Sequence, residues 1–441
     1  MKEVEPKRPK VVFKTLGCRV NQYETQGMRE LCGDPEREAP GCGTDGPVEV
    51  VVINTCTVTR EADRESRYWI RRARREHPSA KIIVTGCGVE KDGALFSRMP
   101  GVHRVLSNDQ KAGIATLLGG EDVSAARPES GVPRVYSPLS ISRSQARTRA
   151  FVKIQDGCNH ACSFCKVVLV RGRSRSRPLG EIVGEVVRLR DNGYREVVFA
   201  GIQLGAYGLD LTGSSKLPGV LEACAKIDGI ERLRLSSIEP LDVSGELLSA
   251  MKGIGKVMPH LHLPLQSGDD SVLGSMNRRY RAAFYEGLTV RLREELPDFM
   301  FSLDVMPGFP GEGEEEFENT VKCLRRLRPL HCHVFPYSRR EGTRAARMTG
   351  EVKPETIRRR VRSLTALSKA LALEVMAPYE GRVIPVLVEE ARGRAKAATS
   401  LSGHTPNFMK VVFEGSPESV GKILPVRLKS VREDAFEGER T

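Results

Sequence analysis

Short runs of β-branched and aliphatic residues alternate with amphipathic stretches in the first quarter of the chain. The runs cover residues 11–13, 50–53, 81–84 and 102–106. Such alternation predicts βαβ units and a parallel sheet. Ligands of such sheets gather beyond the carboxyl ends of the strands. We therefore expect residues 10–120 to form an α/β domain with its chemistry at one edge of the sheet.

A second and longer alternation begins near residue 150. Its strand candidates are residues 151–155, 196–201, 233–237, 260–265, 301–305 and 331–336. Six βα units in about 200 residues are typical of an open or partial (βα)6 barrel with its chemistry on the loops at the strand C-termini. Residues 121–149, rich in Pro, Ser, Gly and Arg without a sustained period, read as a linker. The barrel domain is expected over residues 150–376.

The last part of the chain changes character twice. Between Pro354 and Met376 the apolar residues are spaced by three or four, which predicts a helix. After Pro378, short apolar runs at 383–388, 409–413 and 424–428 are broken by Gly and Pro. This pattern predicts a small β-barrel over residues 377–441. The expected fold class is therefore multidomain α/β with a C-terminal β-barrel.

The cysteines and the first residues of the sequence indicate the cellular compartment. Residues 1–10 are charged and lack the apolar region of a signal peptide, and no apolar run approaches the ~20 residues of a membrane helix. We expect a cytoplasmic protein with no membrane association, in which eleven cysteines indicate metal ligands or catalysis rather than disulfides. Five of them are expected to be inert and buried: Cys32, Cys42, Cys224, Cys323 and Cys332.

Positive charge is concentrated in one segment. The net charge is +13, and residues 127–177 hold eleven Lys or Arg against Glu129 and Asp156. A field of this sign would concentrate a polyanion such as RNA. A solvated basic face is an equal alternative. The basic residues are Arg127, Arg134, Arg143, Arg147, Arg149, Lys153, Lys166, Arg171, Arg173, Arg175 and Arg177.

A C-x3-C-x2-C loop of Cys158, Cys162 and Cys165 directly follows the first strand of the barrel. Three thiolates on a tight loop can hold three irons of a cubane cluster and leave the fourth iron open. The alternatives are a structural zinc site, with His160 as the nearby fourth ligand, and an electron-transfer cluster, which has another spacing and a fourth cysteine. The spacing favours the open cluster.

Three further cysteines, Cys18, Cys56 and Cys87, each lie just past a predicted strand. Their strand-end positions would let them converge on one edge of the sheet. From the residues alone, buried structural cysteines and a second three-thiolate cluster are equally open.

The cluster loop resembles that of the radical S-adenosylmethionine superfamily, which carries it on a partial (βα)6 barrel. The resemblance implies that the open iron chelates the amino and carboxylate groups of S-adenosylmethionine, and that electron transfer releases a 5′-deoxyadenosyl radical. Candidates for S-adenosylmethionine contacts, with ordinary turn chemistry as the equal alternative, are Gly201, Gln203, Ser237, Glu239 and Gln266. No general acid or base is assigned.

The resemblance narrows to the methylthiotransferase family through the three N-terminal cysteine motifs and residues 236–240, 262–268, 308–312 and 335–338. Residues 403–411 resemble the signature of a TRAM domain. The resemblance implies two 4Fe-4S clusters. Cys158, Cys162 and Cys165 hold the radical cluster, and Cys18, Cys56 and Cys87 hold an auxiliary cluster used in sulfur delivery. The implied partners are a tRNA anticodon stem-loop, an electron donor such as flavodoxin or ferredoxin, and a sulfur donor.

Residues 15–25 and 54–59 are most similar to the branch that methylthiolates C2 of N6-threonylcarbamoyladenosine at tRNA position 37. The N6-isopentenyladenosine branch is second and the branch acting on a ribosomal-protein aspartate is third. A non-catalytic RNA-binding metalloprotein is the alternative from another class, and the six motif cysteines argue against it.

Three positions depart from the family pattern without removing a cluster ligand. They are residues 166–169, where an apolar residue and Pro-Tyr are usual, Gly88, where Tyr is common, and Met306-Pro307. The segment after Met376 has ten basic and nine acidic residues, so we expect RNA contacts to be shared with the linker and the cluster loop. The arginines at 60, 64, 67, 71, 72, 74 and 75 could add to them, although a solvated helix face has the greater weight.

Overall fold

The structure is a computed structural model that describes residues 9–33, 47–119, 136, 139–144, 148–212, 216–393 and 399–441. The chain forms two compact units. The N-terminal unit comprises residues 1–145, 156–159 and 165–175, and the C-terminal unit comprises residues 146–155, 160–164 and 176–441. Most of the predicted linker lies outside the described residues, and the boundaries at 120, 149 and 376 stay predictions. No described helix has the length and apolar character needed to cross a membrane.

The N-terminal unit is built on a parallel sheet in the order β1-β2-β3-β4. Its strands are β1 (Val11–Thr15), β2 (Val50–Thr55), β3 (Lys81–Gly86) and β4 (Val102–Leu106), which confirms the four predicted runs. Its helices are α1 (Arg19–Leu31), α2 (Arg60–Glu76), α3 (Cys87–Ser97), η1 (Asn108–Gly113), α4 (Ile114–Leu118) and α5 (Val167–Arg171).

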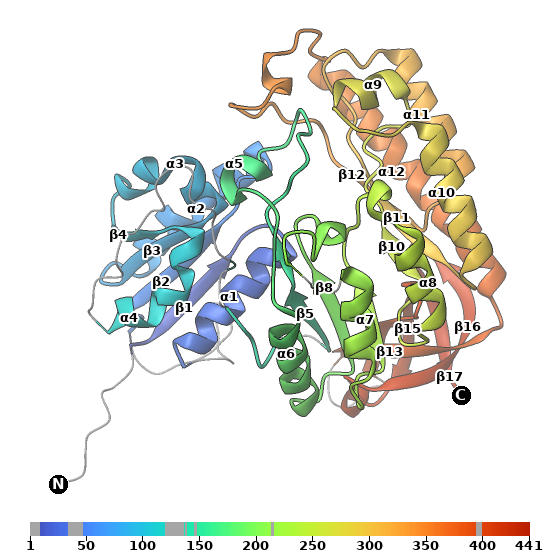
Figure 1. The fold of residues 1–441 in the computed structure, drawn as a ribbon, viewed down its shortest axis with the longest axis horizontal. Helices are drawn as coiled ribbons and strands as arrows, with labels where there is room; N and C mark the ends of the chain where they lie inside the picture. Colours follow the sequence, from blue (N-terminus) through green and yellow to red (C-terminus); the bar gives the residue numbers. More distant parts are fainter. Residues whose placement is uncertain are drawn as a thin grey trace. The chain divides into compact units, whose positions relative to one another are not determined.

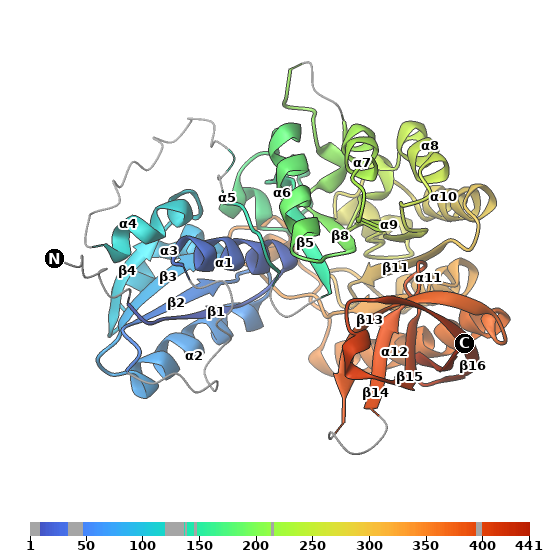
Figure 2. The ribbon, with the colours of Figure 1, turned by 90° about the horizontal axis from the view of Figure 1, so that it is seen from below.

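The helices of this unit cover both faces of the sheet, because side chains along a strand alternate. Ile53 of β2 shares a core with Ile70 of α2 and Val89 of α3. The next side chain, Asn54, points the other way and donates to the Asn21 carbonyl of α1 at 3.0 Å. Helices α1 and α2 therefore lie on opposite faces, as Figure 2 shows.

The C-terminal unit begins with six parallel strands in two sheets, β5-β8-β9 and β10-β11-β12 (Figure 1). A bridge between Ser237 and His262 joins the two sheets. Among the described residues β5 and β12 do not pair, so the barrel is open as predicted. The strands are β5 (Arg149–Lys153), β8 (Glu196–Ala200), β9 (Arg232–Leu235), β10 (His260–His262), β11 (Met300–Val305) and β12 (His331–Val334).

Each barrel strand is followed by a helix, and the last of these, α12 (Pro354–Met376), has the predicted bounds. The short strands β6 (Gln155–Asp156) and β7 (Arg175–Ser176) lie where the chain passes between the units. The other helices are α6 (Leu179–Asp191), η2 (Leu204–Ala206), α7 (Leu217–Ala225), η3 (Pro240–Asp242), α8 (Gly245–Gly253), α9 (Asp270–Ser275), α10 (Ala282–Glu295), α11 (Glu314–Leu327), η4 (Ala345–Arg347) and η5 (Ala377–Tyr379).

A closed five-stranded barrel in the order β13-β14-β15-β17-β16 ends the chain. This confirms the predicted fold, although the sequence indicated only three of the five strands. The described strands are β13 (Val383–Arg392), β14 (Thr399–His404), β15 (Lys410–Gly415), β16 (Ile423–Arg432) and β17 (Ala435–Arg440), with η6 (Pro417–Ser419) before β16.

The closed barrel docks on the amino ends of the parallel strands. Arg232, at the start of β9, donates to the carbonyls of Pro385 at 2.8 Å and His404 at 3.1 Å. Arg234 donates to the Pro406 carbonyl at 3.0 Å. The Phe408 ring stacks on His260, with centroids 4.7 Å apart. The carboxyl ends of the parallel strands, where ligands are expected, lie at the opposite edge.

Candidate cluster and cofactor sites

Three cysteines gather at the carboxyl edge of the N-terminal sheet. Cys56 and Cys87 follow Thr55 and Gly86, which are paired across β2 and β3. The first strand delivers Cys18 through Gly17, which has a φ of +88° and where an added Cβ would lie 2.6 Å from the Cys56 Sγ. Only glycine fits this close approach, so the loop after β1 is packed against the Cys56 thiol.

The thiols of these three cysteines influence one another electrostatically. Burial raises the pKa of Cys56 to about 12, and the charges of Cys18 and Cys87 contribute to the rise. Within the described residues, no three or more His, Cys, Asp or Glu side chains are already arranged to hold a metal ion. The thiolate is the form that binds iron, so cluster assembly at this edge would release protons. The donor set fits a cubane cluster with three protein ligands.

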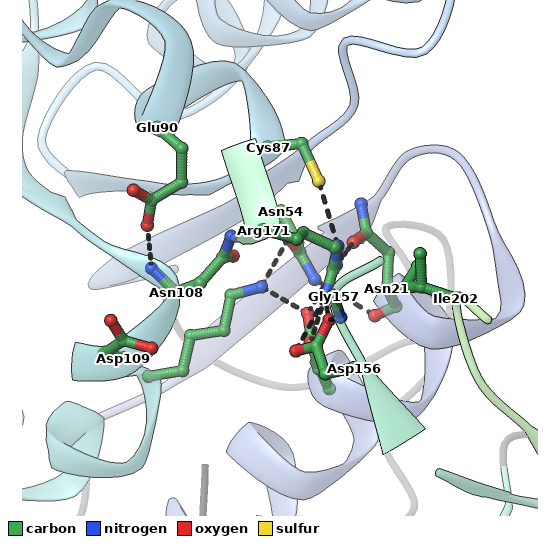
Figure 3. Close-up of polar contacts among 12 residues, drawn as sticks. Asn21, Asn54, Cys87, Glu90, Asn108, Asp109, Asp156, Gly157, Arg171 and Ile202 are labelled. Carbon is green, nitrogen blue, oxygen red and sulfur yellow. Dashed lines mark hydrogen bonds and ion pairs between the residues drawn. The ribbon is translucent and has the colours of Figure 1, made fainter. Parts of the chain in front are cut away.

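A buried polar network lies directly beside Cys87 (Figure 3). Its centre is Arg171 of α5, which is 1% exposed. The Arg171 Nε donates to the Cys87 Sγ at 3.3 Å. Its Nη1 donates to Glu24 at 2.8 Å and to Asp156 at 3.0 Å, and its Nη2 donates to the Asn21 Oδ1 at 2.7 Å. Every nitrogen of this guanidinium therefore has an acceptor.

Lys111 of η1 extends the same network. Its Nζ donates to the Glu24 Oε2 at 2.5 Å and to the Asn54 Oδ1 at 3.2 Å. Burial lowers the pKa of Lys111, and the Glu24 carboxylate opposes this shift. The network was not predicted. A signal was available in Asn21 and Asn54, since each asparagine stands within three residues of a motif cysteine.

The basic segment 127–177 is not a continuous exposed surface. The two interpretations of its charge, an RNA-attracting field and a solvated basic face, are therefore wrong for its buried residues. Lys153, Lys166, Arg171, Arg175 and Arg177 are buried. Arg171, Arg175 and Arg177 form ion pairs inside the protein. Arg177, for example, donates to Glu185 at 2.7 Å. Arg127, Arg134 and Arg147 lie outside the described residues.

The remaining cysteines behave largely as expected. Cys224, Cys323 and Cys332 are buried, and burial raises the pKa of each thiol to about 12. Cys32 is half-buried, which departs from the prediction, and Cys42 lies outside the described residues.

The three cysteines of the C-x3-C-x2-C loop are half-buried. Cys158 and Cys165 belong to the N-terminal unit, and the Cys165 Sγ accepts from the Val167 amide at 3.4 Å. Cys162 belongs to the C-terminal unit, and its Sγ accepts from the Arg278 Nη1 at 3.4 Å. The unusual residues 167–169 form the start of α5, which carries Arg171.

The candidate cofactor residues lie at the carboxyl edge of the parallel strands. Gly201 follows β8, and an added Cβ would lie 2.9 Å from the Gln155 Oε1. That oxygen accepts from the backbone amides of Ile202 at 2.9 Å and Gln203 at 2.8 Å. Glycine at 201 therefore allows Gln155 to fix the turn that carries Gln203.

Gln203 and Glu239 face a common set of polar groups. The Gln203 Nε2 lies 2.8 Å from the His160 Nε2 and donates to Asp242 at 3.5 Å. Glu239 accepts from the Arg278 Nη2 at 2.5 Å. Burial raises the pKa of both Glu239 and Asp242, while Arg278 and His160 oppose the shift. Arg278 and Asp242 were not predicted, and the sequence suggested His160 only as a zinc ligand.

Ser237 and Gln266 complete the predicted set in different ways. Ser237 is exposed on the bridge between β9 and β10. Gln266 is buried with a φ of 72°, and its Oε1 has no hydrogen-bond partner in the described part of the chain. A buried acceptor without a partner is a group that a ligand can satisfy. It fits the amino or ribose hydroxyl donors of S-adenosylmethionine.

Comparison with known proteins identifies both parts of this arrangement. Residues 152–324 match the Radical SAM superfamily, and residues 10–107 match Uncharacterized protein family UPF0004. The chain is similar to radical S-adenosylmethionine methyltransferase TsrM from Kitasatospora setae, with a TM-score of 0.53 and 16% identity over 74% of this chain and 73% of that one. This likeness concerns the fold alone.

Similarity over nearly the full length is found with two kinds of enzyme. The chain is 38% identical to Threonylcarbamoyladenosine tRNA methylthiotransferase MtaB of Bacillus subtilis, over 95% of this chain and 93% of that protein. It is 35% identical to tRNA-2-methylthio-N(6)-dimethylallyladenosine synthase of Acidothermus cellulolyticus, over 96% and 86%. With the Radical SAM match, these relatives show that the chain belongs to the radical S-adenosylmethionine methylthiotransferase family, whose cofactors are S-adenosylmethionine and 4Fe-4S clusters.

Proposed function

We propose that this enzyme adds a methylthio group to C2 of N6-threonylcarbamoyladenosine at position 37 of tRNA. The observation that carries the proposal is the 38% identity over 95% of the chain with a threonylcarbamoyladenosine tRNA methylthiotransferase. When bound, S-adenosylmethionine and a reduced 4Fe-4S cluster supply the radical reactivity that the inert C2 position requires.

The protein's own residues would bind and orient these groups. We assign Cys158, Cys162 and Cys165 to the cluster that binds S-adenosylmethionine, and Cys18, Cys56 and Cys87 to the auxiliary cluster. The Gln266 Oε1 would accept from a donor of S-adenosylmethionine, because it is buried and has no hydrogen-bond partner among the described residues. Arg278, which donates to Glu239 at 2.5 Å, would hold the Glu239 carboxylate at the same edge of the parallel strands.

The partners follow from this chemistry. The substrate would be a tRNA anticodon stem-loop, and the reduced cluster requires an electron donor, for which a flavodoxin or ferredoxin is proposed. A sulfur donor must restore the sulfur that leaves with the product. The cytoplasm, where tRNA is modified, is the proposed location.

Methylthiolation of N6-isopentenyladenosine in tRNA is the second candidate. It is supported by the 35% identity with a dimethylallyladenosine synthase, over 96% of this chain. The two substrates differ at N6, where a polar threonylcarbamoyl group replaces an apolar isoprenoid group.

The decisive experiment uses protein purified and reconstituted with iron and sulfide without oxygen. It is incubated with S-adenosylmethionine, dithionite and tRNA carrying either N6-threonylcarbamoyladenosine or N6-isopentenyladenosine, and the nucleosides are analysed by mass spectrometry. We expect a methylthio product only on the first tRNA, and none with Cys158→Ala or Cys56→Ala.

Other outcomes separate the parts of the proposal. A product on the second tRNA alone would move the enzyme to the isopentenyladenosine branch. 5′-Deoxyadenosine without either product would retain the radical chemistry and reject both substrates. A protein that binds one or two zinc ions instead of roughly eight irons would be a non-catalytic metalloprotein.

A further inference from the structure

We infer that Arg171 is a positioning residue for the auxiliary cluster, and that its hydrogen bond to the Cys87 sulfur raises the cluster's reduction potential. The inference rests on the proposed function, because it takes Cys18, Cys56 and Cys87 as ligands of that cluster. It adds a residue from outside the UPF0004 match, since Arg171 lies beyond residues 10–107.

The first argument is the direction of the guanidinium. Arg171 is the last residue of α5 and lies six positions after Cys165. Its Nε–H is directed at the Cys87 Sγ at 3.3 Å, while the other two nitrogens are fixed by Glu24, Asp156 and Asn21. The planar fork of arginine cannot rotate without breaking several of these bonds. The sulfur therefore faces a donor whose position is set in advance.

The second argument is the local charge. Arg171, Lys111 and Arg175 are three buried cations, and Glu24 and Asp156 are two buried carboxylates. The ion pairs Lys111–Glu24 at 2.5 Å, Arg171–Asp156 at 3.0 Å and Arg175–Asp156 at 3.2 Å join these groups without using a thiolate. A cluster with three cysteine ligands adds negative charge next to Arg171. The Nε–H then becomes a charge-assisted donor to sulfur, which is stronger than a neutral donor.

These two effects act on the reduction potential in the same direction. Reduction adds an electron, so a nearby cation and a hydrogen bond to a ligand sulfur both stabilise the reduced cluster. A neighbouring carboxylate has the opposite effect. The structure places both kinds of group in one network, so substitutions within it should shift the potential in opposite directions.

The test isolates the auxiliary cluster in a parent protein that carries Cys158→Ala, Cys162→Ala and Cys165→Ala, and each further substitution is made in this parent. The reconstituted protein is titrated electrochemically and followed by electron paramagnetic resonance, with iron and sulfide measured in every sample. We expect Arg171→Gln to lower the midpoint potential, Arg171→Lys to lower it less, and Glu24→Gln to raise it.

The matched control is Arg177→Gln. Arg177 is also buried, at 3% exposure, and is paired with Glu185 at 2.7 Å. Its substitution removes a buried guanidinium without altering the network around Cys87, so the potential should stay at the parent value.

Each outcome has a distinct meaning. Equal potentials in the parent, Arg171→Lys and Glu24→Gln, with roughly four irons bound in each, would overturn the inference and leave the proposed function intact. If Arg171→Gln does not fold, the opposite shifts in potential expected for Arg171→Lys and Glu24→Gln still test the inference. If the parent itself binds no iron, the auxiliary-cluster assignment falls, and the inference falls with it.

Discussion

At the scale of single residues, Glu196 shows how this protein stabilises a buried charge. It stands at the start of β8, is 1% exposed, and accepts from the Arg234 Nε at 2.8 Å. The Arg232 and Arg149 guanidinium groups lie 3.6 Å and 4.0 Å away. Burial alone would raise the pKa of Glu196, but the three arginines lower it below its ordinary value.

Removing the Glu196 charge should therefore be costly. Glu196→Gln leaves the buried Arg232 and Arg234 without their carboxylate and Arg149 with Glu389 alone. We expect a loss of about 3–5 kcal/mol in the free energy of unfolding. Urea denaturation would measure it. The control is Glu231→Gln, because Glu231 has a side chain 44% exposed in its pair with Arg195 and should lose less than about 0.5 kcal/mol. Equal losses in the two variants would contradict the account.

The same carboxylate makes a prediction about acid stability. A carboxyl group with a folded pKa below its unfolded value contributes stability above the unfolded pKa, here 4.5, and loses it as the pH falls toward the folded pKa. We expect the stability difference between the native chain and Glu196→Gln to be constant from pH 7 to about 5 and to shrink below 4.5. A difference that grows on acidification would contradict this expectation.

The residues near the sites show what sequence alone could predict. The six motif cysteines stand next to strand ends or in a recognisable loop, so local patterns were enough to predict them as cluster ligands. The hydrogen-bond partners of Arg171 are residues 21, 24, 87 and 156, and no local pattern joins them. Arg171 was therefore read as part of a basic stretch, because burial depends on tertiary packing and a count of charges does not include it.

At the scale of elements, helix α2 separates its charges around its axis. At about 100° per residue, Arg60, Arg64, Arg67, Arg71, Arg74 and Arg75 fall on one face. Glu61, Glu65 and Glu76 fall on the flank next to it, and the buried residues Ser66, Ile70 and Ala73 lie on another face. Tyr68, 48% exposed, borders the arginine face. A positive stripe of this kind suits an RNA backbone.

We expect the arginine face of α2 to contact tRNA phosphates. Replacing Arg64, Arg67, Arg71 and Arg75 with Gln should weaken tRNA binding and reduce the slope of log affinity against log salt by about 3, at roughly 0.7–0.9 per lost contact. Fluorescence anisotropy with labelled tRNA at several salt concentrations would measure both.

A control for α2 changes the same net charge elsewhere. Arg291, Arg326, Arg358 and Arg359 have side chains at least half exposed and are paired with acidic residues. Their replacement with Gln should leave the salt slope near the native value. If both quadruple variants weaken binding equally, the α2 face has no specific role.

Element prediction succeeded where one type of apolar pattern was sustained. Helix α12 was predicted with its observed bounds because its apolar residues keep a helical spacing throughout. Strands β14 and β17 were missed because Leu401 and Phe436 are the only buried apolar residues in each. A small closed barrel gives such strands their pairing from neighbours, and one apolar residue does not define a period.

At the scale of the whole molecule, the C-terminal barrel shares a core with the parallel strands it docks on. Met300 of β11, Leu330 and Met376 pack with barrel residues such as Val426 and Phe436. The sequence indicated two separate domains here, with a boundary at 376. Contacts between segments so far apart in the chain cannot be inferred from either segment's own pattern.

Removal of the C-terminal barrel should therefore harm the rest of the C-terminal unit. A chain that ends at Met376 would expose Met300, Leu330 and Met376 to water. We expect it to aggregate, whereas the full chain prepared in parallel stays dispersed, as size-exclusion chromatography and light scattering would show. A truncated chain that is dispersed and melts at the native temperature would contradict the shared core.

The docking contacts of Arg232 and Arg234 have a consequence for how this family can diversify. Both arginines donate to main-chain carbonyls, those of Pro385, His404 and Pro406. Every residue has a backbone carbonyl, whatever its side chain. The two arginines therefore depend on the path of the barrel's backbone and not on its side chains. A barrel from a relative could be grafted after α12 and would be accepted if its loops follow the same path. Recombination between relatives could then exchange the C-terminal barrel without rebuilding the parallel strands on which it docks.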